Sequence, residues 1–257
     1  MKVIPVPCLS DNYAYLVICE ASGVAGVVDP SEASPVAARV KKEGVTLKAI
    51  LNTHHHWDHI GGNNELIGRF GELAVYGHNS DRGRIDGLTN GLETGDVFML
   101  GELEVKALHN PGHTSGAVSF VIEDSVFTGD TMFAGGCGRL FEGTPANMYA
   151  SLNKVIGGLP DTTKVYFGHE YTENNLRFAE AVEPGNQAVR DKLAAVRNTR
   201  ASGGFTTPSN LAEEWATNPF MRCGSEEIKA RVKQEEPGND LSPEAVLGVV
   251  RRLKDNF

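Results

Sequence analysis

The first two thirds of the chain carry short apolar runs separated by loops rich in glycine, asparagine and aspartate. Many of these runs are β-branched or aromatic, which is typical of strands. We predict strands at residues 3–6, 13–18, 25–28, 49–51, 74–76, 96–100, 103–108, 117–122, 126–128 and 164–167. We predict helices at residues 34–43, 63–70 and 147–156, and a surface loop between the strands that end at 76 and begin at 96.

The pattern changes after about residue 172, and no strand is predicted beyond that point. Apolar residues instead recur at helical spacing, as Val189, Leu193 and Val196 do. We predict helices at 186–200, from Pro208-Ser209 onward, and from Ser242-Pro243 onward. The chain is therefore expected to have a strand-rich α+β domain at 1–172 and a helical domain at 173–257.

Composition narrows the classes of protein. The 257 residues are 40% hydrophobic and 22% charged, as in ordinary globular proteins. A net charge of −9 disfavours nucleic acid as a partner. No apolar run approaches the ~20 residues that span a membrane, and no leader is recognisable at the N-terminus. We expect a cytoplasmic monomer, or an organellar protein if a leader has been removed from a longer precursor.

The four cysteines, Cys8, Cys19, Cys137 and Cys223, are far apart and form no CxxC pair. Disulfide frameworks belong mainly to short secreted chains. We therefore expect these thiols to be reduced, mostly buried, and not to bind metal.

Histidines concentrate in the segment Thr53-His-His-His-Trp-Asp-His-Ile-Gly-Gly62, directly after the predicted strand at 49–51. In an extended segment alternate residues point the same way, so His54 and His56 share a side and His55 points elsewhere. Asp58 and His59 follow a short turn later and can face a second point. The two glycines that follow, Gly61 and Gly62, allow a tight turn into the helix at 63–70.

Three more residues that can bind metal each follow a predicted strand: His113, Asp130 and His169. Strand ends at one edge of a sheet converge, and rigid strands position functional loops. These three residues and the four from the histidine segment are enough to bind two metal ions. Asp29 also ends a strand and is either a loop residue or a hydrogen-bond partner of a metal-binding imidazole. His55, His78 and His109 are not expected to bind metal.

We predict that His54, His56 and His113 bind the first metal, and that Asp58, His59 and His169 bind the second. Asp130 would bridge the two ions, because its two oxygens and negative charge offset their repulsion. Two cations ~3.5–4 Å apart can share a water and supply hydroxide near pH 7, which would attack a carbonyl carbon. Zinc is the first expectation, and iron or manganese suits the same donors. The chain has no Ser–His–Asp or GxSxG pattern that would supply a nucleophile instead.

The HxHxDH segment with His113, Asp130 and His169 resembles the metallo-β-lactamase superfamily, which implies an αββα sandwich with the metal site at one edge. Further motifs are similar to glyoxalase II, the hydroxyacylglutathione hydrolases. The similarity extends from residue 1 to the final helix. These motifs are Thr53-His-His-His-Trp-Asp-His59, Phe127-Thr-Gly-Asp-Thr131, Gly136-Cys-Gly138, Gly168-His-Glu-Tyr-Thr172 and Asn218-Pro-Phe-Met-Arg222.

The resemblance implies hydrolysis of S-(2-hydroxyacyl)glutathione, chiefly S-D-lactoylglutathione, to D-lactate and glutathione, the second step of methylglyoxal detoxification. It also implies that the C-terminal domain helps to bind the glutathione moiety. Arg139 stands where many relatives have lysine, and Phe141 where many have tyrosine, so one hydroxyl contact is expected to be missing. The implied substrate-binding residues are Arg139, Phe141, His169, Tyr171, Arg251 and Lys254.

Three alternatives stay open at this point. A mononuclear iron persulfide dioxygenase of the same superfamily would need fewer ligands and would consume oxygen. Retention of Asp58, His59 and His169 together with the helical C-terminal domain argues against it. An RNA-processing nuclease is disfavoured by the net charge and by the lack of a basic surface. A non-enzymatic scaffold is disfavoured by the complete set of ligands.

Overall fold

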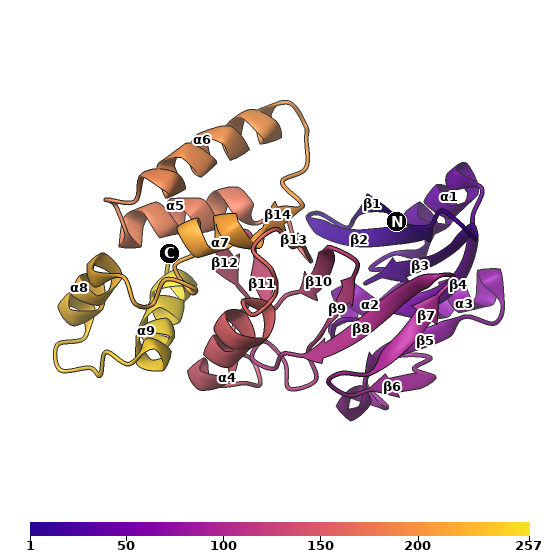
Figure 1. Ribbon diagram of the computed structural model, residues 1–257, viewed down its shortest axis with the longest axis horizontal. Coiled ribbons are helices and arrows are strands. Elements are labelled where there is room, and N and C mark those ends of the chain that lie inside the picture. Colours follow the sequence, from indigo (N-terminus) through magenta and orange to yellow (C-terminus); the bar gives the residue numbers. More distant parts are fainter. The chain divides into compact units, whose positions relative to one another are not determined.

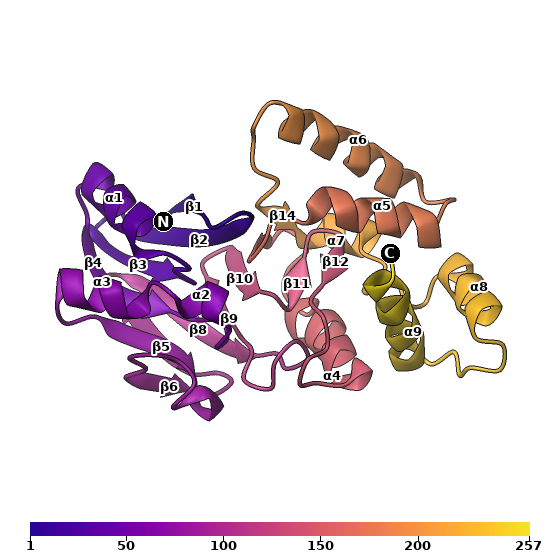
Figure 2. The same ribbon diagram turned by 180° about the vertical axis from the view of Figure 1, so that it is seen from behind.

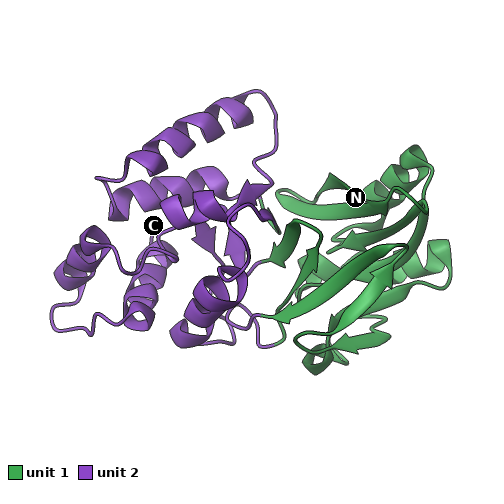
Figure 3. Cartoon of the chain, viewed as in Figure 1, with its two compact units in different colours: residues 1–109, 116–129, 166–169 green, residues 110–115, 130–165, 170–257 purple.

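The computed structural model of the protein describes residues 1–257. The chain forms two compact units, shown in green and purple in Figure 3. Unit 1 comprises residues 1–109, 116–129 and 166–169, and unit 2 comprises residues 110–115, 130–165 and 170–257. The chain therefore passes between the units more than once, and each unit joins segments that are far apart in sequence. A division into consecutive domains at residue 172 stays a prediction.

Unit 1 contains two sheets. The first has the strand order β1-β2-β3-β4-β5-β6, and in the second the strands of this unit follow the order β13-β10-β9-β8-β7. The strands of the first sheet are β1 (Lys2–Cys8), β2 (Asn12–Cys19), β3 (Val24–Val28), β4 (Thr46–Leu51), β5 (Ala74–His78) and β6 (Asn90–Leu92). Those of the second are β7 (Val97–Leu100), β8 (Leu103–His109), β9 (Val118–Ile122), β10 (Ser125–Gly129) and β13 (Lys164–Phe167), of which Tyr166 and Phe167 belong to unit 1.

The two sheets of unit 1 pack face to face, and helices cover the outer face of the first. Tyr15 contacts Phe127 with ring centroids 5.6 Å apart, and Tyr76 stacks on Phe98 at 3.7 Å. On the other face, α1 and α3 bury apolar residues against the first sheet (Figures 1 and 2). The helical segments of unit 1 are α1 (Ala33–Glu43), α2 (Trp57–Ile60), α3 (Asn63–Phe70) and the 3₁₀ turn η1 (Asn79–Asp81).

Unit 2 is mostly helical. Its segments are β11 (Met132–Phe133), β12 (Gly136–Cys137), α4 (Pro145–Ala150), the π-helix η2 (Ser151–Ile156), α5 (Thr172–Val182), α6 (Gln187–Ala201), β14 (Ser209–Asn210), α7 (Leu211–Thr217), α8 (Glu226–Glu235) and α9 (Pro243–Asp255). Helices α5 and α6 bury a shared apolar cluster that includes Leu176, Val189 and Leu193. None of the helices in the protein has the length and hydrophobicity that crossing a membrane requires.

The structure contains every strand predicted before residue 172, and it ends α1 at Gly44, whose φ of 67° is left-handed. The prediction of no later strand was wrong. Ser209 and Asn210 pair with Val165 and Lys164 as β14, so helix α7 begins only at Leu211. The predicted surface loop before residue 96 also contains β6. Such short strands exist only because a partner strand lies beside them, and a single segment gives no sign of its partner.

Candidate metal centre and substrate pocket

Unit 1 brings Asp58, His59 and His169 together. Their ligand atoms all lie within 4.8 Å of one another. Asp58 Oδ2 is 3.7 Å from His59 Nε2 and 3.4 Å from His169 Nε2, and the two Nε2 atoms face each other at 3.3 Å. Asp58 and His59 belong to the short helix α2, whereas His169 follows β13, so two strand ends meet here as the sequence predicted.

The protonation of the two imidazoles is set by the groups behind them. His59 Nδ1 lies 3.0 Å from Asp29 Oδ2, and His169 Nδ1 lies 2.7 Å from Asp11 Oδ1. A carboxylate can only accept, so each Nδ1 carries a hydrogen, and in the neutral imidazole each Nε2 then presents a lone pair. Two lone pairs at 3.3 Å beside a carboxylate repel one another unless a cation lies among them. This donor set fits a divalent transition metal ion.

Asp29 connects both parts of the histidine segment. It is 2% exposed, and its oxygens accept from the backbone N–H of Thr53 at 2.7 Å and from the Thr53 hydroxyl at 2.6 Å. Because that hydroxyl donates to Asp29, it accepts from His54 Nδ1 at 3.0 Å. His54 Nε2 is then the unprotonated atom, and it lies 3.1 Å from His56 Nδ1. One carboxylate thus orients His59 directly and His54 through Thr53.

His55 points away from these ligands, as expected from the alternation. Its Nδ1 lies 3.6 Å from the buried carboxylate of Asp81, and its Nε2 accepts from Arg84 Nη1 at 3.4 Å. The predicted reason for the glycines was wrong. Gly61 and Gly62 have φ of −57° and −85°, which any residue adopts, but a Cβ there would lie 2.7 Å from Ser31 O and 2.6 Å from Pro30 O. These positions need glycine for space rather than for a turn.

Unit 2 holds the other two predicted ligands side by side. His113 Nε2 is 3.6 Å from Asp130 Oδ2, and both residues are buried. His113 Nδ1 donates to the carbonyl of Arg139 at 2.8 Å, so its Nε2 also presents a lone pair. Each unit therefore contains imidazole and carboxylate groups whose remaining electron pairs are directed at neighbouring ligand atoms.

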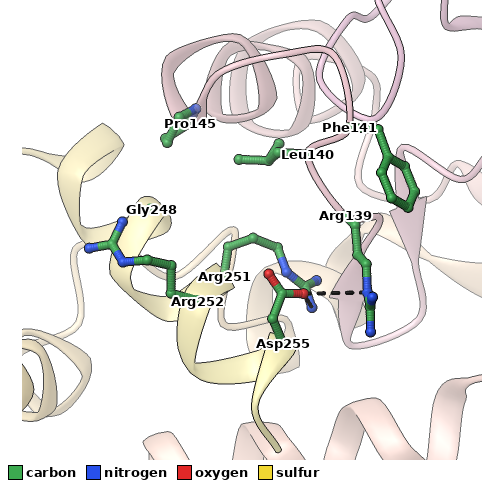
Figure 4. Close-up of a pocket in the computed structure, with 8 residues that line it drawn as sticks. All are labelled: Arg139, Leu140, Phe141, Pro145, Gly248, Arg251, Arg252 and Asp255. Atoms are coloured by element: carbon green, nitrogen blue, oxygen red, sulfur yellow. Dashed lines mark hydrogen bonds and ion pairs between the residues drawn. The ribbon is translucent and has the colours of Figure 1, made fainter.

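Unit 2 also contains a pocket with a volume of about 430 Å³. It is lined by Arg139, Leu140, Phe141, Pro145, Gly248, Arg251, Arg252 and Asp255 (Figure 4). The guanidinium groups of Arg139 and Arg251 lie 3.5 Å and 3.2 Å from Asp255 Oδ1. The pocket therefore combines several cations with one carboxylate, a pattern that suits a ligand carrying charges of both signs.

The predicted substrate-binding residues differ in exposure. Phe141 is 63% exposed and contacts His113 edge to face, and Tyr171 is 39% exposed. Arg251 is 6% exposed and already donates to the carbonyl of Cys137 at 2.7 Å. Lys254 Nζ lies over the rings of Phe178 and Phe257. Burial lowers the pKa of the Lys254 amine to about 8, and the charges of Arg251 and Arg177 act in the same direction.

Sequence reasoning missed several residues that contact the ligands. Asp11 and Asn12 lie in the loop between the predicted strands at 3–6 and 13–18, and the sequence assigns no role to them or to the hydroxyl of Thr53. No local signal identifies Asp11, because its partner lies 158 residues away. The four cysteines are free and buried, as predicted.

We expect Asp29→Asn to weaken metal binding by roughly 10–100-fold, the usual cost of removing a carboxylate behind a ligand histidine. The amide would place a donor where Thr53 and His59 both donate. Zinc affinity, measured by competition with a chromophoric chelator, tests this expectation. Thr53→Ser keeps the hydroxyl and should stay close to the wild type. Unchanged zinc affinity in Asp29→Asn would refute the orienting role of the carboxylate.

Comparison with known proteins agrees with this geometry. The metallo-β-lactamase superfamily model matches residues 11–169, and a second model, described as the hydroxyacylglutathione hydrolase C-terminus, matches residues 170–257. The crystal structure of ETHE1 from Myxococcus xanthus is 26% identical, covers 99% of this chain and 98% of its own, and superposes with a TM-score of 0.69. TTHA1623, solved in a di-iron-bound form, is 26% identical over 86% of this chain and 100% of its own, with a TM-score of 0.61. The fold and the donor set are those of a metallo-β-lactamase-type metalloprotein.

Curated relatives define the family more narrowly. Hydroxyacylglutathione hydrolase from Methylococcus capsulatus is 46% identical over 100% of this chain and 99% of its own. The cytoplasmic hydroxyacylglutathione hydrolase of Arabidopsis thaliana is 44% identical over 100% of this chain and 99% of its own. The chain belongs to the hydroxyacylglutathione hydrolase family, the glyoxalase II enzymes. The family, the enzyme class and the α+β metallo-β-lactamase fold with a helical C-terminal region, predicted from the sequence, are confirmed.

Proposed function

We propose that this protein hydrolyses S-(2-hydroxyacyl)glutathione, chiefly S-D-lactoylglutathione, at a centre of two divalent metal ions. The observation that carries the proposal is the pair of facing imidazole nitrogens, His59 Nε2 and His169 Nε2, 3.3 Å apart beside the Asp58 carboxylate. Membership of the hydroxyacylglutathione hydrolases supplies the class of substrate. The products would be a 2-hydroxy acid, D-lactate for the principal substrate, and glutathione.

In this proposal the ligands divide into two sets. His54, His56 and His113 would hold the first metal, Asp58, His59 and His169 would hold the second, and Asp130 would be a ligand of both. Asp29 orients His54 and His59, which supports their assignment as ligands. His113 donates to the Arg139 carbonyl, which supports the same assignment for His113. The relative solved in a di-iron-bound form supports two ions rather than one. We propose zinc, with iron or manganese as alternatives that the same donors accept.

Two bound divalent ions would lower the pKa of a water towards neutrality and polarise the thioester carbonyl. The protein contributes the orientation of its ligands through Asp29, Asp11 and the Arg139 carbonyl. A thiolate is a good leaving group, so protonation of the leaving group is less demanding than in amide hydrolysis. The chain therefore needs no nucleophilic side chain of its own.

Glutathione carries two carboxylates and one ammonium group, and the pocket of unit 2 offers partners for both signs. We propose that Arg139 and Arg251, which line the pocket, attract the carboxylates together with Lys254, which lies outside the lining, while Asp255 of the pocket suits the ammonium group. Phe141 and Tyr171 add aromatic surface, and His169 completes the predicted contacts. Phe141 offers no hydroxyl, so the peptide is held by charge and apolar contact at that position.

The direct test is loss of the thioester absorbance of S-D-lactoylglutathione with the purified full-length chain. We expect rapid hydrolysis that a chelator abolishes and that added zinc restores. A lactoyl thioester of a small thiol without the peptide serves as the matched substrate and should react much more slowly. If the metal-replete protein does not hydrolyse S-D-lactoylglutathione, the proposal fails, and oxygen consumption with glutathione persulfide becomes the next assay.

The pKa of Lys254, about 8, predicts how substrate capture depends on pH. Below pH 8 the amine is charged and attracts a glutathione carboxylate, and above pH 8 it loses the proton and the attraction. We expect kcat/KM to fall above pH 8, because kcat/KM reports ionisations of the free enzyme. The fall should come mainly from a rise in KM, because Lys254 is proposed to bind the substrate rather than to take part in the chemical step. Lys254→Arg keeps the charge at all these pH values and should lose this fall. A basic limb of the same shape in Lys254→Arg would contradict the assignment.

We also propose a cytoplasmic location, which the name of the Arabidopsis relative supports. Fractionation of cells that express the untagged protein would test it, with cytosolic and organellar marker proteins followed in the same fractions.

A further inference from the structure

The turn between β1 and β2 is closely defined by its surroundings. Cys8 pairs with Asn12 across the two strands, so Leu9, Ser10 and Asp11 close a tight hairpin. Leu9 has a φ of 50°, which a non-glycine residue adopts rarely, and its N–H donates to Glu32 Oε2 at 2.6 Å. The two strands continue the pairing along their whole lengths, from Lys2 opposite Ile18 to this turn. The backbone of the turn is therefore well fixed where it carries the side chains of Asp11 and Asn12.

These side chains reach two ligands that belong to the same set. Asp11 Oδ1 accepts from His169 Nδ1 at 2.7 Å. Asn12 Nδ2 donates to Asp58 Oδ2 at 3.1 Å and to the Asp58 carbonyl at 3.0 Å. The backbone is joined at the same place, because the N–H of Tyr13 donates to the carbonyl of Gly168 at 2.8 Å. One turn thus fixes a histidine from the end of β13 and a carboxylate from α2.

We propose that Asp11 and Asn12 are the positioning residues of the second metal site, and that they control its occupancy without controlling the first. Asp11 holds His169 with its Nε2 lone pair directed at His59 and Asp58. Asn12 fixes the rotamer of Asp58 by donating to the oxygen that faces both imidazoles. The inference rests on the proposed function, because it assumes that these three ligands bind a metal ion.

The selectivity follows from the difference between this turn and Asp29. Asp29 supports both parts of the histidine segment, since it orients His59 directly and His54 through Thr53. Asp11 and Asn12 have side-chain contacts with His169 and Asp58, and these belong only to the second set. Loss of Asp29 should therefore weaken the binding of both metal ions, and loss of Asp11 should weaken the binding of the second ion alone.

The expected loss of zinc affinity follows from the hydrogen bond between Asp11 and His169. In Asp11→Asn the charge is lost, and an amide that turns its N–H₂ towards His169 would favour hydrogen on Nε2, the atom that should bind metal. Removal of a carboxylate behind a ligand histidine weakens metal affinity by roughly 10–100-fold. Asn12→Ala leaves the charge of the turn intact and removes only the donor to Asp58, so it separates the two contributions.

The test titrates zinc into the full-length apoprotein in competition with a chromophoric chelator, and resolves the two dissociation constants. The variants are Asp11→Asn and Asn12→Ala. The control is Asp161→Asn, which removes the same charge from an exposed turn of unit 2. We expect both variants to bind the second zinc roughly 10–100-fold more weakly and the first within about twofold of the wild type, with the control unchanged. Substitution of cobalt and its visible spectrum provide an independent count of occupied sites.

If both zinc ions bound equally more weakly, the proposal would be overturned, because the turn would then support the fold as a whole. Unchanged binding of the second ion in Asp11→Asn and in Asn12→Ala would overturn it as well. Neither result would affect the proposed hydrolysis by the wild type. A wild-type protein that binds a single zinc ion would instead reject the centre of two ions, and this inference with it.

Discussion

Asp130→Ala is expected to lose metal and hydrolytic activity together. Asp130 is the proposed bridge, and both ions would lose a ligand and the negative charge that offsets their repulsion. Metal-ion catalysis contributes several kcal/mol to stabilisation of the transition state. Since about 1.4 kcal/mol corresponds to tenfold in rate, we expect kcat/KM to fall by at least ~10³-fold. Metal content by mass spectrometry and hydrolysis of S-D-lactoylglutathione are measured on the same preparation.

The structure supports attributing the expected loss of metal and activity to the Asp130 side chain. The residue follows β10 directly after Gly129, whose φ is 49° and where a Cβ would lie 2.1 Å from Thr53 Oγ1. The loop is therefore closely constrained, and Asp130 lies 3.6 Å from His113. Asp124→Ala, in the exposed turn before β10, is the matched control and should retain metal and activity. Full activity of Asp130→Ala after metal depletion would refute the mechanism.

Glu214→Ala is expected to destabilise the protein by ~3–5 kcal/mol, the usual cost of removing one partner of a buried ion pair. Glu214 is fully buried, and its oxygens accept from Lys192 Nζ at 2.8 Å, from Ser209 Oγ at 2.5 Å, from Gly135 N–H at 2.7 Å and from Asn218 Nδ2 at 3.1 Å. Burial alone would lower the pKa of Lys192, but its ion pairs with Glu214 and Glu213 outweigh burial and raise it. Without Glu214, the largely enclosed Lys192 ammonium, whose side chain is 13% exposed, would lose its main partner.

Glu213→Ala is the matched control for this stability prediction. Glu213 also pairs with Lys192, at 3.1 Å, but its side chain is 51% exposed. An exposed pair contributes at most ~1 kcal/mol, so the two neighbouring variants should differ clearly in urea unfolding. For a protein of this size a loss of ~3–5 kcal/mol would lower Tm by roughly 10 °C. Equal stabilities of the two variants would contradict the assigned role of the Glu214 network.

The sequence by itself determined the longer strands of the first 172 residues, though not the short strands β6, β11 and β12, and it determined which residues are proposed as ligands. Spacing was sufficient for the histidine segment, because alternation in an extended chain directs His54 and His56 to one side and His55 to another. It was also sufficient to find His113, Asp130 and His169 at strand ends. Both are properties of local geometry, which a short stretch of sequence contains. The shared motifs then gave the family, which the full-length relatives confirm.

The tertiary structure alone decided the partners that hold these ligands in place. Asp11 meets His169, Asn12 meets Asp58, and Glu214 meets Gly135, and these pairs are separated by 158, 46 and 79 residues. It also showed that Gly61 and Gly62 are needed for space, and that Ser209 and Asn210 pair as a strand. Local propensity carries no record of such contacts, because the packing of distant segments determines which side chains meet and which positions leave no room for a Cβ.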